Sequence, residues 1–201
     1  MRAEPSPADR ATRIVIIDPS PVRRAILEEG LAAAGYRDIV HLDGIERVME
    51  RIVALDPDVI VIDLESPTRD VLEQMFQVSR AVPRPVAMFV DRSDTAMIQA
   101  AMDAGVSAYV VDGLRKERVK PILDMCISRF NVFSRMRDEL AQAKSQLEER
   151  RTIDRAKTLL MRAKGISEDE AYGLLRRTAM NEQKRVAEVA QAVNMAAELL
   201  R

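Results

Sequence analysis

Cysteine, histidine and aromatic residues are scarce in this sequence of 201 residues, which has one cysteine, one histidine and no tryptophan. The cysteine, Cys126, has no partner for an internal disulfide and no metal-ligand spacing around it, and its apolar helical position predicts a buried thiol. A single histidine, His41, argues against a Ser-His-Asp triad and against a multi-histidine metal site. Aromatic residues make up 3% of the chain, which argues against stacking platforms for single-stranded bases.

Three further features are missing, and each argues against a class of protein. No apolar run approaches about 20 residues, so we expect no membrane-spanning helix. The opening residues, MRAEPSPADR, lack the apolar core of a secretory signal, so we expect a disordered tail over residues 1–12 and a cytoplasmic protein. The sequence has no glycine-rich phosphate loop and no nucleophile–base pair, so we expect neither a nucleotide-binding fold nor an enzyme.

The formal net charge of −1 conceals a division along the chain. Residues 13–124 contain 14 Lys and Arg against 19 Asp and Glu, whereas residues 150–185 contain 10 Lys and Arg against 5 Asp and Glu. A basic patch on a compact unit is the electrostatic feature that binds polyanions. A solvated helical surface gives the same pattern, and charge alone leaves both interpretations open.

Short β-branched runs alternate with amphipathic helical segments over the first 120 or so residues. This alternation predicts an α/β fold of the flavodoxin-like type, with a doubly wound, five-stranded parallel sheet. We expect strands at residues 13–18, 38–42, 58–63, 85–90 and 107–111. We expect helices at residues 21–36, 44–55, 70–81 and 94–104, and from about residue 114.

Aspartates follow four of the predicted strands, at Asp18, Asp63, Asp91 and Asp112. Ligands of doubly wound sheets bind beyond the carboxyl ends of the strands, where these side chains gather. Carboxylates there could hold a hard cation such as Mg²⁺, with Asp18 and Asp63 as its ligands, and present one oxygen for phosphoryl transfer. Asp63 could instead cap the loop that follows its strand.

Three segments, IVIIDPSPVRR, DVIVIDLESP and GVSAYVVDG, resemble the signature strands of response-regulator receiver domains. The resemblance covers about residues 13–125, and we place the receiver-like domain at residues 13–128. It implies that Asp63 is the phosphoacceptor and that Asp18 belongs to the acidic pair that holds Mg²⁺. The family also uses a Ser or Thr after the fourth strand and a Lys after the fifth.

Three positions depart from the receiver pattern. Pro19 stands where a second acid is expected, Val90 takes the Ser/Thr position and Asp112 takes the Lys position. Valine cannot hydrogen-bond a phosphoryl oxygen, and a carboxylate would repel a phosphorylated aspartate. Lys116 is a nearby cation that could reach in instead. The sequence therefore establishes no cofactor, and Mg²⁺ is the one candidate. We expect that a partner protein controls the receiver in place of phosphorylation.

A long helix is predicted from about residue 116 to residue 164, because this stretch has one proline and no glycine. Apolar residues recur along it at alternating spacings of three and four, which is a short heptad repeat. These residues are Phe133, Met136, Leu140, Ala143 and Leu147. We place a coiled-coil linker at residues 129–150 and expect a parallel homodimer. The alternative is a single helix whose apolar stripe packs on its own receiver.

The last third of the chain predicts a small bundle of three helices. Gly165 ends the first helix, and Ser167 with Glu170 forms a capping box that begins the second. We expect Asn181 to cap the third helix. Basic residues of all three helices could lie on one face, and they would then form a phosphate-binding surface.

The motifs IDRAK, LM, SEDEA, LLRRTAM and EVAQ occur here in order and closely resemble the ANTAR domain, an RNA-binding output domain of antitermination regulators. The resemblance covers about residues 136–198, and we place the domain at residues 136–201. It implies binding to stem-loops of nascent mRNA leaders, which prevents a terminator from forming. The implied RNA-binding residues are Arg155, Ala156, Lys157, Arg176, Arg177, Ala179, Met180 and Gln191. The small side chains of Ala156 and Ala179 would allow close approach of RNA, or they serve helix packing.

The segments MFVDRSD, YVVDGL and ERRTIDRAK are similar to regulators of the NasT type, which govern nitrate and nitrite assimilation. This resemblance implies a nitrate-sensing partner protein of the NasS type that sequesters the regulator. The alternative is a phosphorylation-activated response regulator that acts on another operon or on DNA. A DNA reader would need base-reading side chains on its recognition helix, and the third helix is mostly Ala, Val and Glu.

Overall fold

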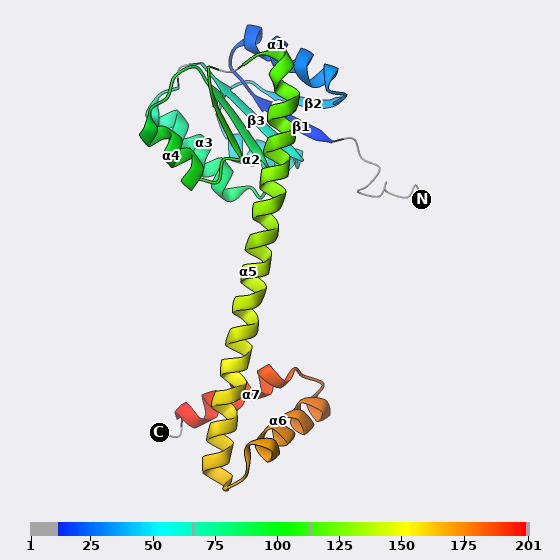
Figure 1. Cartoon of the computed structure of the whole chain (residues 1–201), viewed down its shortest axis with the longest axis vertical. Helices are drawn as coiled ribbons and strands as arrows, with labels where there is room; N and C mark the ends of the chain where they lie inside the picture. Colours follow the sequence, from blue (N-terminus) through cyan, green and yellow to red (C-terminus); the bar gives the residue numbers. More distant parts are fainter. Residues whose placement is uncertain (1–11, 66, 113, 200–201) are drawn as a thin grey trace, which may run out of the picture. The chain divides into compact units, whose positions relative to one another are not determined.

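The computed structural model of the chain describes residues 12–65, 67–112 and 114–199 (Figure 1). The tail expected over residues 1–12 falls outside these residues, except for Thr12. The chain divides into two compact units, the first running through Phe133 and the second beginning at Ser134.

The first unit contains the five-stranded parallel sheet that the sequence predicted. Its strands follow the spatial order β2-β1-β3-β4-β5, and every neighbouring pair is parallel. Strands β1 and β3 are therefore central neighbours, with Ile14 opposite Val59 in their register. The strands are β1 (Arg13–Ile17), β2 (Asp38–Leu42), β3 (Val59–Leu64), β4 (Val86–Val90) and β5 (Ala108–Val111).

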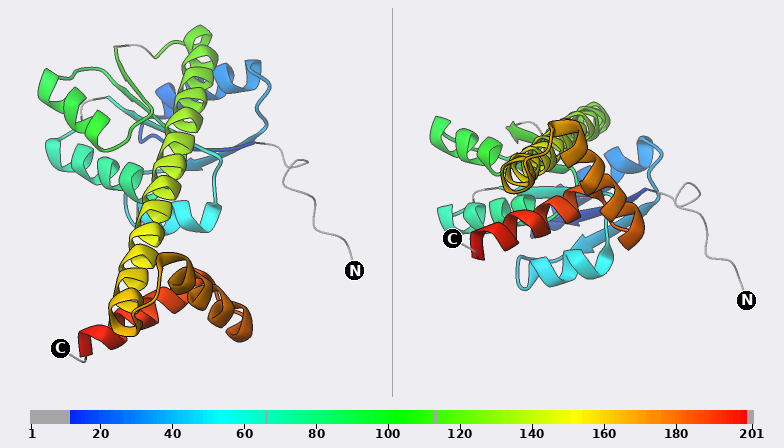
Figure 2. Two further views of the ribbon diagram at one scale, coloured as in Figure 1. Left: turned by 60° about the horizontal axis from the view of Figure 1, so that its bottom comes forward. Right: turned by 90° about the horizontal axis from the view of Figure 1, so that it is seen from below.

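Alternation along each strand sends side chains to the two faces of this sheet. Val15 and Ile17 lie in a core with α2, α3 and α4, whereas Ile14 and Ile16 lie in a core with α1 and the first turns of α5. Both faces are apolar because helices cover both, as parallel sheets require; Figure 2 shows the sheet between these helices. The helices are α1 (Pro21–Ala33), α2 (Val48–Leu55), α3 (Arg69–Ala81), α4 (Thr95–Asp103) and α5 (Lys116–Lys164).

The thiol of Cys126 is buried in the second of these cores, as expected. Burial raises its pKa to about 12, so the thiol stays protonated and unreactive at neutral pH. None of the described helices is both long enough and apolar enough to cross a membrane.

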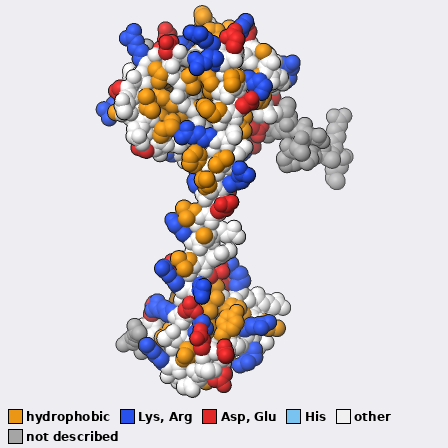
Figure 3. All heavy atoms as spheres, in the orientation of Figure 1, with side chains coloured by type: hydrophobic (Ala, Val, Ile, Leu, Met, Phe, Trp, Pro, Cys, Tyr) orange, Lys and Arg blue, Asp and Glu red, His pale blue; other side chains and the backbone are white. Residues whose placement is uncertain are grey.

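Helix α5 is continuous over 49 residues, which confirms the long helix predicted from the scarcity of breakers. It ends where Gly165 adopts a positive φ of 65°, the left-handed conformation that glycine tolerates at helix ends. The apolar heptad residues are exposed along this helix in the single chain, with Met136 58% and Leu140 56% accessible (Figure 3).

The second unit joins the last turns of α5 to α6 (Glu168–Glu182) and α7 (Val186–Leu199). Its core is small, consisting of Ala156, Leu175, Ala179, Val189 and Ala190. The predicted capping box is present at the start of α6: the Ser167 hydroxyl accepts from the Glu170 N–H, and the Glu170 carboxylate accepts from the Ser167 N–H.

The prediction for Asn181 is wrong. This residue still lies inside α6, which ends only where Gln183 turns into the left-handed region with φ 55°. Helix α7 begins at Val186 instead, and the backbone N–H of Arg185 donates to the Glu188 carboxylate at 2.8 Å. The short polar side chain of Asn181 suggested a cap, but the capping is supplied by Glu188 from within the next helix.

The close packing of α1 against α5 at Gly30 can be tested by substitution. A Cβ atom at this position would lie 2.7 Å from Val119 Cγ2 and 2.9 Å from the Lys116 carbonyl oxygen. We expect Gly30→Ala to lower the free energy of unfolding by about 1–3 kcal/mol because the packed helices must separate. Denaturant unfolding followed by circular dichroism measures the change.

Gly173 supplies the matched control, since it is also a glycine inside a helix. A Cβ atom there would meet only the Arg177 side chain, at 3.7 Å. Gly173→Ala should therefore stabilise the chain by up to about 1 kcal/mol through helix propensity. Equal effects of the two substitutions would contradict the close approach of α1 and α5.

Candidate functional site

The ends of β1, β3 and β4 bring three carboxylates to one edge of the sheet, as the sequence predicted. Asp63 is the fifth residue of β3 and is fully buried, Asp18 follows β1 and is 1% exposed, and Asp91 follows β4. Asp112, at the end of β5, is instead exposed and has a positive φ of 48°.

The guanidinium of Arg23 lies among these carboxylates. Its Nε donates to Asp63 Oδ2 at 2.9 Å and its Nη2 donates to Asp63 Oδ1 at 2.6 Å. Its Nη1 donates to Asp91 Oδ1 at 2.6 Å. Both oxygens of Asp63 are thus occupied by one planar fork, the strongest arrangement that an arginine makes with a carboxylate.

The protonation of this cluster follows from burial and from Arg23. Burial raises the pKa of the Asp63 carboxyl, and the hydrogen bonds and charge of Arg23 act in the opposite direction. The Asp63 carboxylate in turn raises the pKa of Arg23, so the guanidinium keeps its charge at every pH at which the protein is folded.

Asp18 is held by the loop in which it stands. Its Oδ1 accepts from the Ser20 N–H at 2.6 Å, and its own carbonyl oxygen accepts from Arg24 Nη2 at 2.9 Å. Its Oδ2 is buried and has no hydrogen-bond partner among the described residues. Burial is the main cause that raises the pKa of this carboxyl.

The oxygen atoms of this pocket are poorly arranged for Mg²⁺, and the expected ligand pair of Asp18 and Asp63 stays a prediction. Mg²⁺ requires near-octahedral oxygen coordination. Both Asp63 oxygens accept from Arg23, one Asp18 oxygen accepts from Ser20, and Pro19 offers no side-chain oxygen. Within the described ranges, no group of three or more acidic, His or Cys side chains is arranged to hold a metal ion.

The other positions of the receiver switch also carry side chains that depart from the receiver pattern. Val90 is buried in the core beneath the sheet edge. The Lys116 ammonium lies 3.5 Å from a Glu29 carboxylate oxygen, and both side chains are exposed. In the part of the chain that the structure describes, the cation hydrogen-bonded to Asp63 is Arg23.

Arg23 is the functional residue that reasoning from the sequence missed. The signal was available, because Arg23 and Arg24 stand in the first turn of a helix that has no acidic residue there. A cation at a helix N-terminus is disfavoured by the helix dipole. Two of them next to four strand-end aspartates indicate that partners lie outside the helix.

In the second unit, the structure separates the predicted RNA-binding residues into two groups. Ala156 and Ala179 are buried in the core, with 0% and 3% exposure. Their burial agrees with the helix-packing interpretation, and the interpretation as RNA-contacting residues stays a prediction.

The basic residues of this unit also differ from one another. Lys157 Nζ lies 2.7 Å from Asp154 and 2.6 Å from Glu168, and Arg155 lies 2.6 Å from Glu198. Arg176 and Arg177 on α6 are exposed and form no ion pair or hydrogen bond with another described residue. Their guanidinium groups are available to an external anion.

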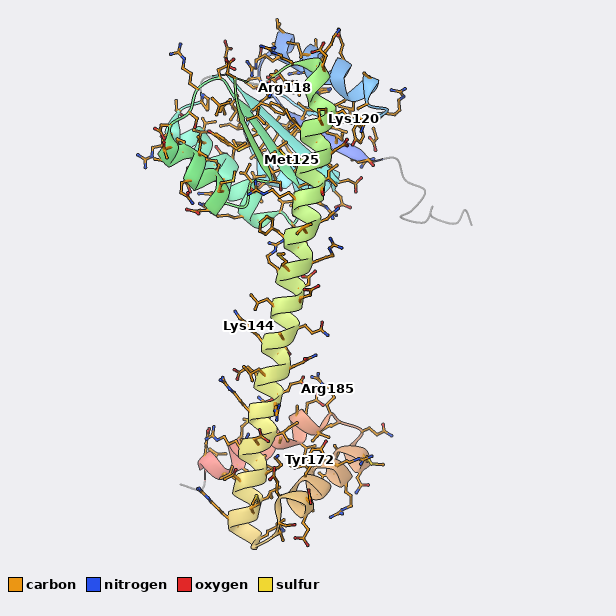
Figure 4. The ribbon with its side chains drawn as sticks, viewed as in Figure 1. Arg118, Lys120, Met125, Lys144, Tyr172 and Arg185 are labelled. Atoms are coloured by element: carbon orange, nitrogen blue, oxygen red, sulfur yellow. The ribbon has the colours of Figure 1, made fainter. Side chains whose placement is uncertain are left out.

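Two uncharged predicted residues are exposed as well. Met180 lies on α6 with 69% of its surface accessible, and Gln191 lies on α7. Tyr172, which the sequence did not single out, lies on α6 (Figure 4). It lines a shallow groove with Arg150 and Lys157 of α5. A lone tyrosine gives no signal in the sequence, and only the fold brings it beside basic residues of α5.

Comparison with known proteins agrees with both units. The family profile of the response regulator receiver domain matches residues 14–124, which is more than half of the chain, and the ANTAR domain profile matches residues 141–193. The chain belongs to the response regulators and joins a receiver domain to an ANTAR domain.

Two relatives are regulatory proteins. The transcriptional regulatory protein PdtaR of Mycobacterium tuberculosis is 28% identical over 180 residues, which cover 88% of each chain. The nitrate regulatory protein of Klebsiella oxytoca is 34% identical over 74 residues, which cover 37% of this chain and 19% of that protein.

A solved structure shares the fold of the first unit. The CheY-like receiver domain protein of Methanospirillum hungatei superposes with a TM-score of 0.53 at 13% identity, covering 61% of this chain and 98% of that one. The predicted receiver fold is therefore confirmed.

The capping box that begins α6 can be tested by mutation and pH. Ser167→Ala should lower the free energy of unfolding by about 0.5–2 kcal/mol, because an N–H at the helix start loses its acceptor. Hydrogen bonds from the Ser167 backbone and hydroxyl lower the pKa of Glu170 below its ordinary value of 4.5. Its stabilising effect is therefore present above pH 4.5 and is lost as the pH falls through the lowered pKa.

The measurement is urea unfolding at a series of pH values. Glu170→Gln should lose this part of the acid dependence, and Ser145→Ala, at an exposed position of α5, should match the wild type. An unchanged acid dependence in Glu170→Gln would refute the assignment.

Proposed function

We propose that this protein is an RNA-binding transcription antiterminator. Its ANTAR domain binds stem-loops in nascent mRNA leaders and prevents a terminator from forming. It acts in the cytoplasm, on leaders of nitrate and nitrite assimilation genes, under the control of a nitrate-sensing protein of the NasS type. The receiver domain is the surface through which that partner acts, and phosphorylation has no part in the control.

The observation that supports this proposal most strongly is the pair Arg176 and Arg177. Both guanidinium groups are exposed on α6 of a domain matched by the ANTAR profile, and neither pairs with a described carboxylate. Arginine binds phosphates through its fork of donors and stacks on unpaired bases. Exposed Met180 follows one turn after Arg176 and adds an apolar contact next to the cations.

Action on duplex DNA is supported less well. A helix that reads the major groove presents polar or basic side chains to base edges. Helix α7, the third of the domain, has the sequence VAEVAQAVNMAAEL and contains no Lys or Arg. Base-edge contacts from this helix would come from Gln191 or Asn194, and Asn194 is already buried and donates to the Thr152 carbonyl oxygen.

The exposed heptad stripe on α5 supports a parallel homodimer. Phe133, Met136, Leu140 and Leu147 are each about half exposed in the single chain, and a second copy of the helix would cover them by knobs-into-holes packing. Dimerisation would present two ANTAR domains together. Two domains on one RNA with two hairpins gain affinity through their high effective concentration.

The proposal that the target genes are those of nitrate assimilation rests on sequence similarity. The MFVDRSD, YVVDGL and ERRTIDRAK segments resemble NasT-type regulators, and the nitrate regulatory protein of Klebsiella oxytoca matches about a third of the chain. Control by a partner is supported by departures from the phosphorylation switch: Val90 and Asp112 take the Ser/Thr and Lys positions, and Arg23 donates to both oxygens of Asp63.

RNA binding is tested with a two-hairpin leader RNA and a duplex DNA of equal charge, titrated over a range of salt concentrations. We expect the wild type to prefer the RNA. Arg176→Ala and Arg177→Ala should each weaken RNA binding about tenfold and reduce the salt dependence by about one counterion. Lys157→Ala should have a smaller effect, because its ammonium is already neutralised by two carboxylates.

Arg135→Ala is the charge-matched control, since Arg135 is exposed on α5 outside the region matched by the ANTAR profile. Equal binding of RNA and DNA, with the same steep salt dependence for both, would mean that the basic surface binds any polyanion. The antitermination proposal would then fail.

The dimer is tested by sedimentation equilibrium of the full chain. Leu140→Lys, at the centre of the stripe, should shift the protein toward monomer, because a buried ammonium in the seam has no partner. Ser145→Lys introduces the same charge on the opposite side of α5 and should leave the dimer intact. A wild type that remains monomeric at all concentrations would refute the linker dimer.

A further inference from the structure

The position of Arg23 is electrostatically unfavourable within its own helix. It is the third residue of α1, whose first turn contains two arginines and no acid, and the helix dipole repels cations there. The favourable contacts all lie elsewhere in the fold, because Arg23 donates two hydrogen bonds to Asp63 in β3 and one to Asp91 after β4. Contacts with the sheet edge, and not with its own helix, therefore stabilise the charge of Arg23 at this position.

The loop before α1 aims Arg23 at the pocket. Pro19 and Pro21 restrict the backbone on either side of Ser20, and Pro21 occupies the first position of the helix, where its fixed φ suits the helical conformation. The Ser20 N–H donates to Asp18 Oδ1 at 2.6 Å, which closes an Asx turn. Pro19, which stands where a second acid is expected, thus also restricts the loop that positions Arg23 at the pocket.

The Arg23 side chain fills the pocket closely. It is 17% exposed, and the Asp63 side chain beneath it is fully buried. A divalent cation at Asp63 would have to displace the guanidinium from both carboxylate oxygens and also overcome its positive charge. A phosphoryl donor would likewise find both oxygens of the would-be nucleophile engaged as hydrogen-bond acceptors.

We propose that Arg23 is a built-in counter-ion that takes the place of a divalent cation at Asp63 and closes the pocket to Mg²⁺ and to phosphoryl transfer. The three carboxylates then serve to anchor the start of α1 to the ends of β3 and β4. The receiver is held in one state by its own arginine. A signal must reach it through another surface. This inference deepens the regulation proposed above and is independent of RNA recognition.

The experiment compares the full-length wild type with Arg23→Gln in metal binding and in phosphorylation. Mn²⁺ is the probe for the cation, because it has the oxygen preference of Mg²⁺ and its binding is measured by electron paramagnetic resonance. Melting temperatures with and without Mg²⁺ give a second readout. Acetyl phosphate tests transfer of its phosphoryl group to an Asp63 oxygen with release of acetate, followed by intact mass.

For the wild type we expect no Mn²⁺ binding at the pocket, no change of melting temperature with Mg²⁺ and no phosphoryl adduct. Arg23→Gln keeps a side-chain N–H donor but loses the charge. Its affinity for Mn²⁺ should rise by about tenfold or more, because the site becomes more negative by one unit at short range. Mg²⁺ should restore several degrees of the melting temperature that the substitution lowers.

Two further variants make the assignment specific. Arg24→Gln removes the neighbouring arginine, which contacts the Asp18 carbonyl oxygen and Asp43 and no oxygen of Asp63, and it should respond to cations as the wild type does. The double variant Arg23→Gln with Asp63→Asn should lose the cation response that Arg23→Gln gains.

The wild-type measurements keep the proposal testable even if Arg23→Gln is too unstable to study. Specific Mn²⁺ binding or an acetyl-phosphate adduct on Asp63 in the wild type would overturn it. So would an Arg23→Gln protein that folds but responds to cations no more than the wild type. None of these results depends on RNA, so failure here leaves the RNA titrations to be judged separately.

Discussion

The ion pair between Arg23 and Asp63 is the interaction on which the acidic edge of the receiver depends. Asp63 is fully buried at the end of a central strand, where an uncompensated carboxylate would be strongly destabilising. Removing one partner of such a buried pair costs about 3–5 kcal/mol. The bidentate arginine makes the carboxylate tolerable and also ties α1 to two strands. In the role that we propose for Arg23, the Asp63 oxygens that accept from its guanidinium are not available to a metal ion or to a phosphoryl group.

Ion pairing also distinguishes the basic side chains of the ANTAR domain that are already paired with carboxylates from those that are free to bind an external anion. Lys157 and Arg155 face carboxylates of the same domain, and the pairs help to join α5 to α6 and α7. Arg176 and Arg177 have no such partners among the described residues. A count of basic residues in this segment therefore overstates the number of cations that are free to bind an anion, and Arg176 and Arg177 are among those without a partner.

Much of the fold could be predicted from the sequence, because the spacing of apolar residues and the residues that cap or end helices are local signals. Buried β-branched runs gave the five strands, and the capping box and Gly165 gave the ends of α5 and α6. The prediction that Asn181 caps the last helix failed, because α6 continues through Asn181 and ends at Gln183, which has a left-handed conformation. The site was harder, since it depends on contacts between distant residues. Asp18 and Asp63 could be placed at one edge, but Arg23 lies 40 positions away from Asp63 in sequence, and no periodicity links them.

The central claim is that a guanidinium of this chain occupies the place of a cation in its receiver domain. The most direct measurement is a nitrogen–proton NMR spectrum of the arginine Nε–H groups, with the Arg23 signal identified from its absence in Arg23→Gln. We predict an Arg23 Nε–H resonance that exchanges slowly with water, as expected for a largely buried donor held by Asp63, and that does not move when Mg²⁺ is added. A rapidly exchanging Arg23 signal, or one that shifts with Mg²⁺ together with the Asp63 amide, would contradict it.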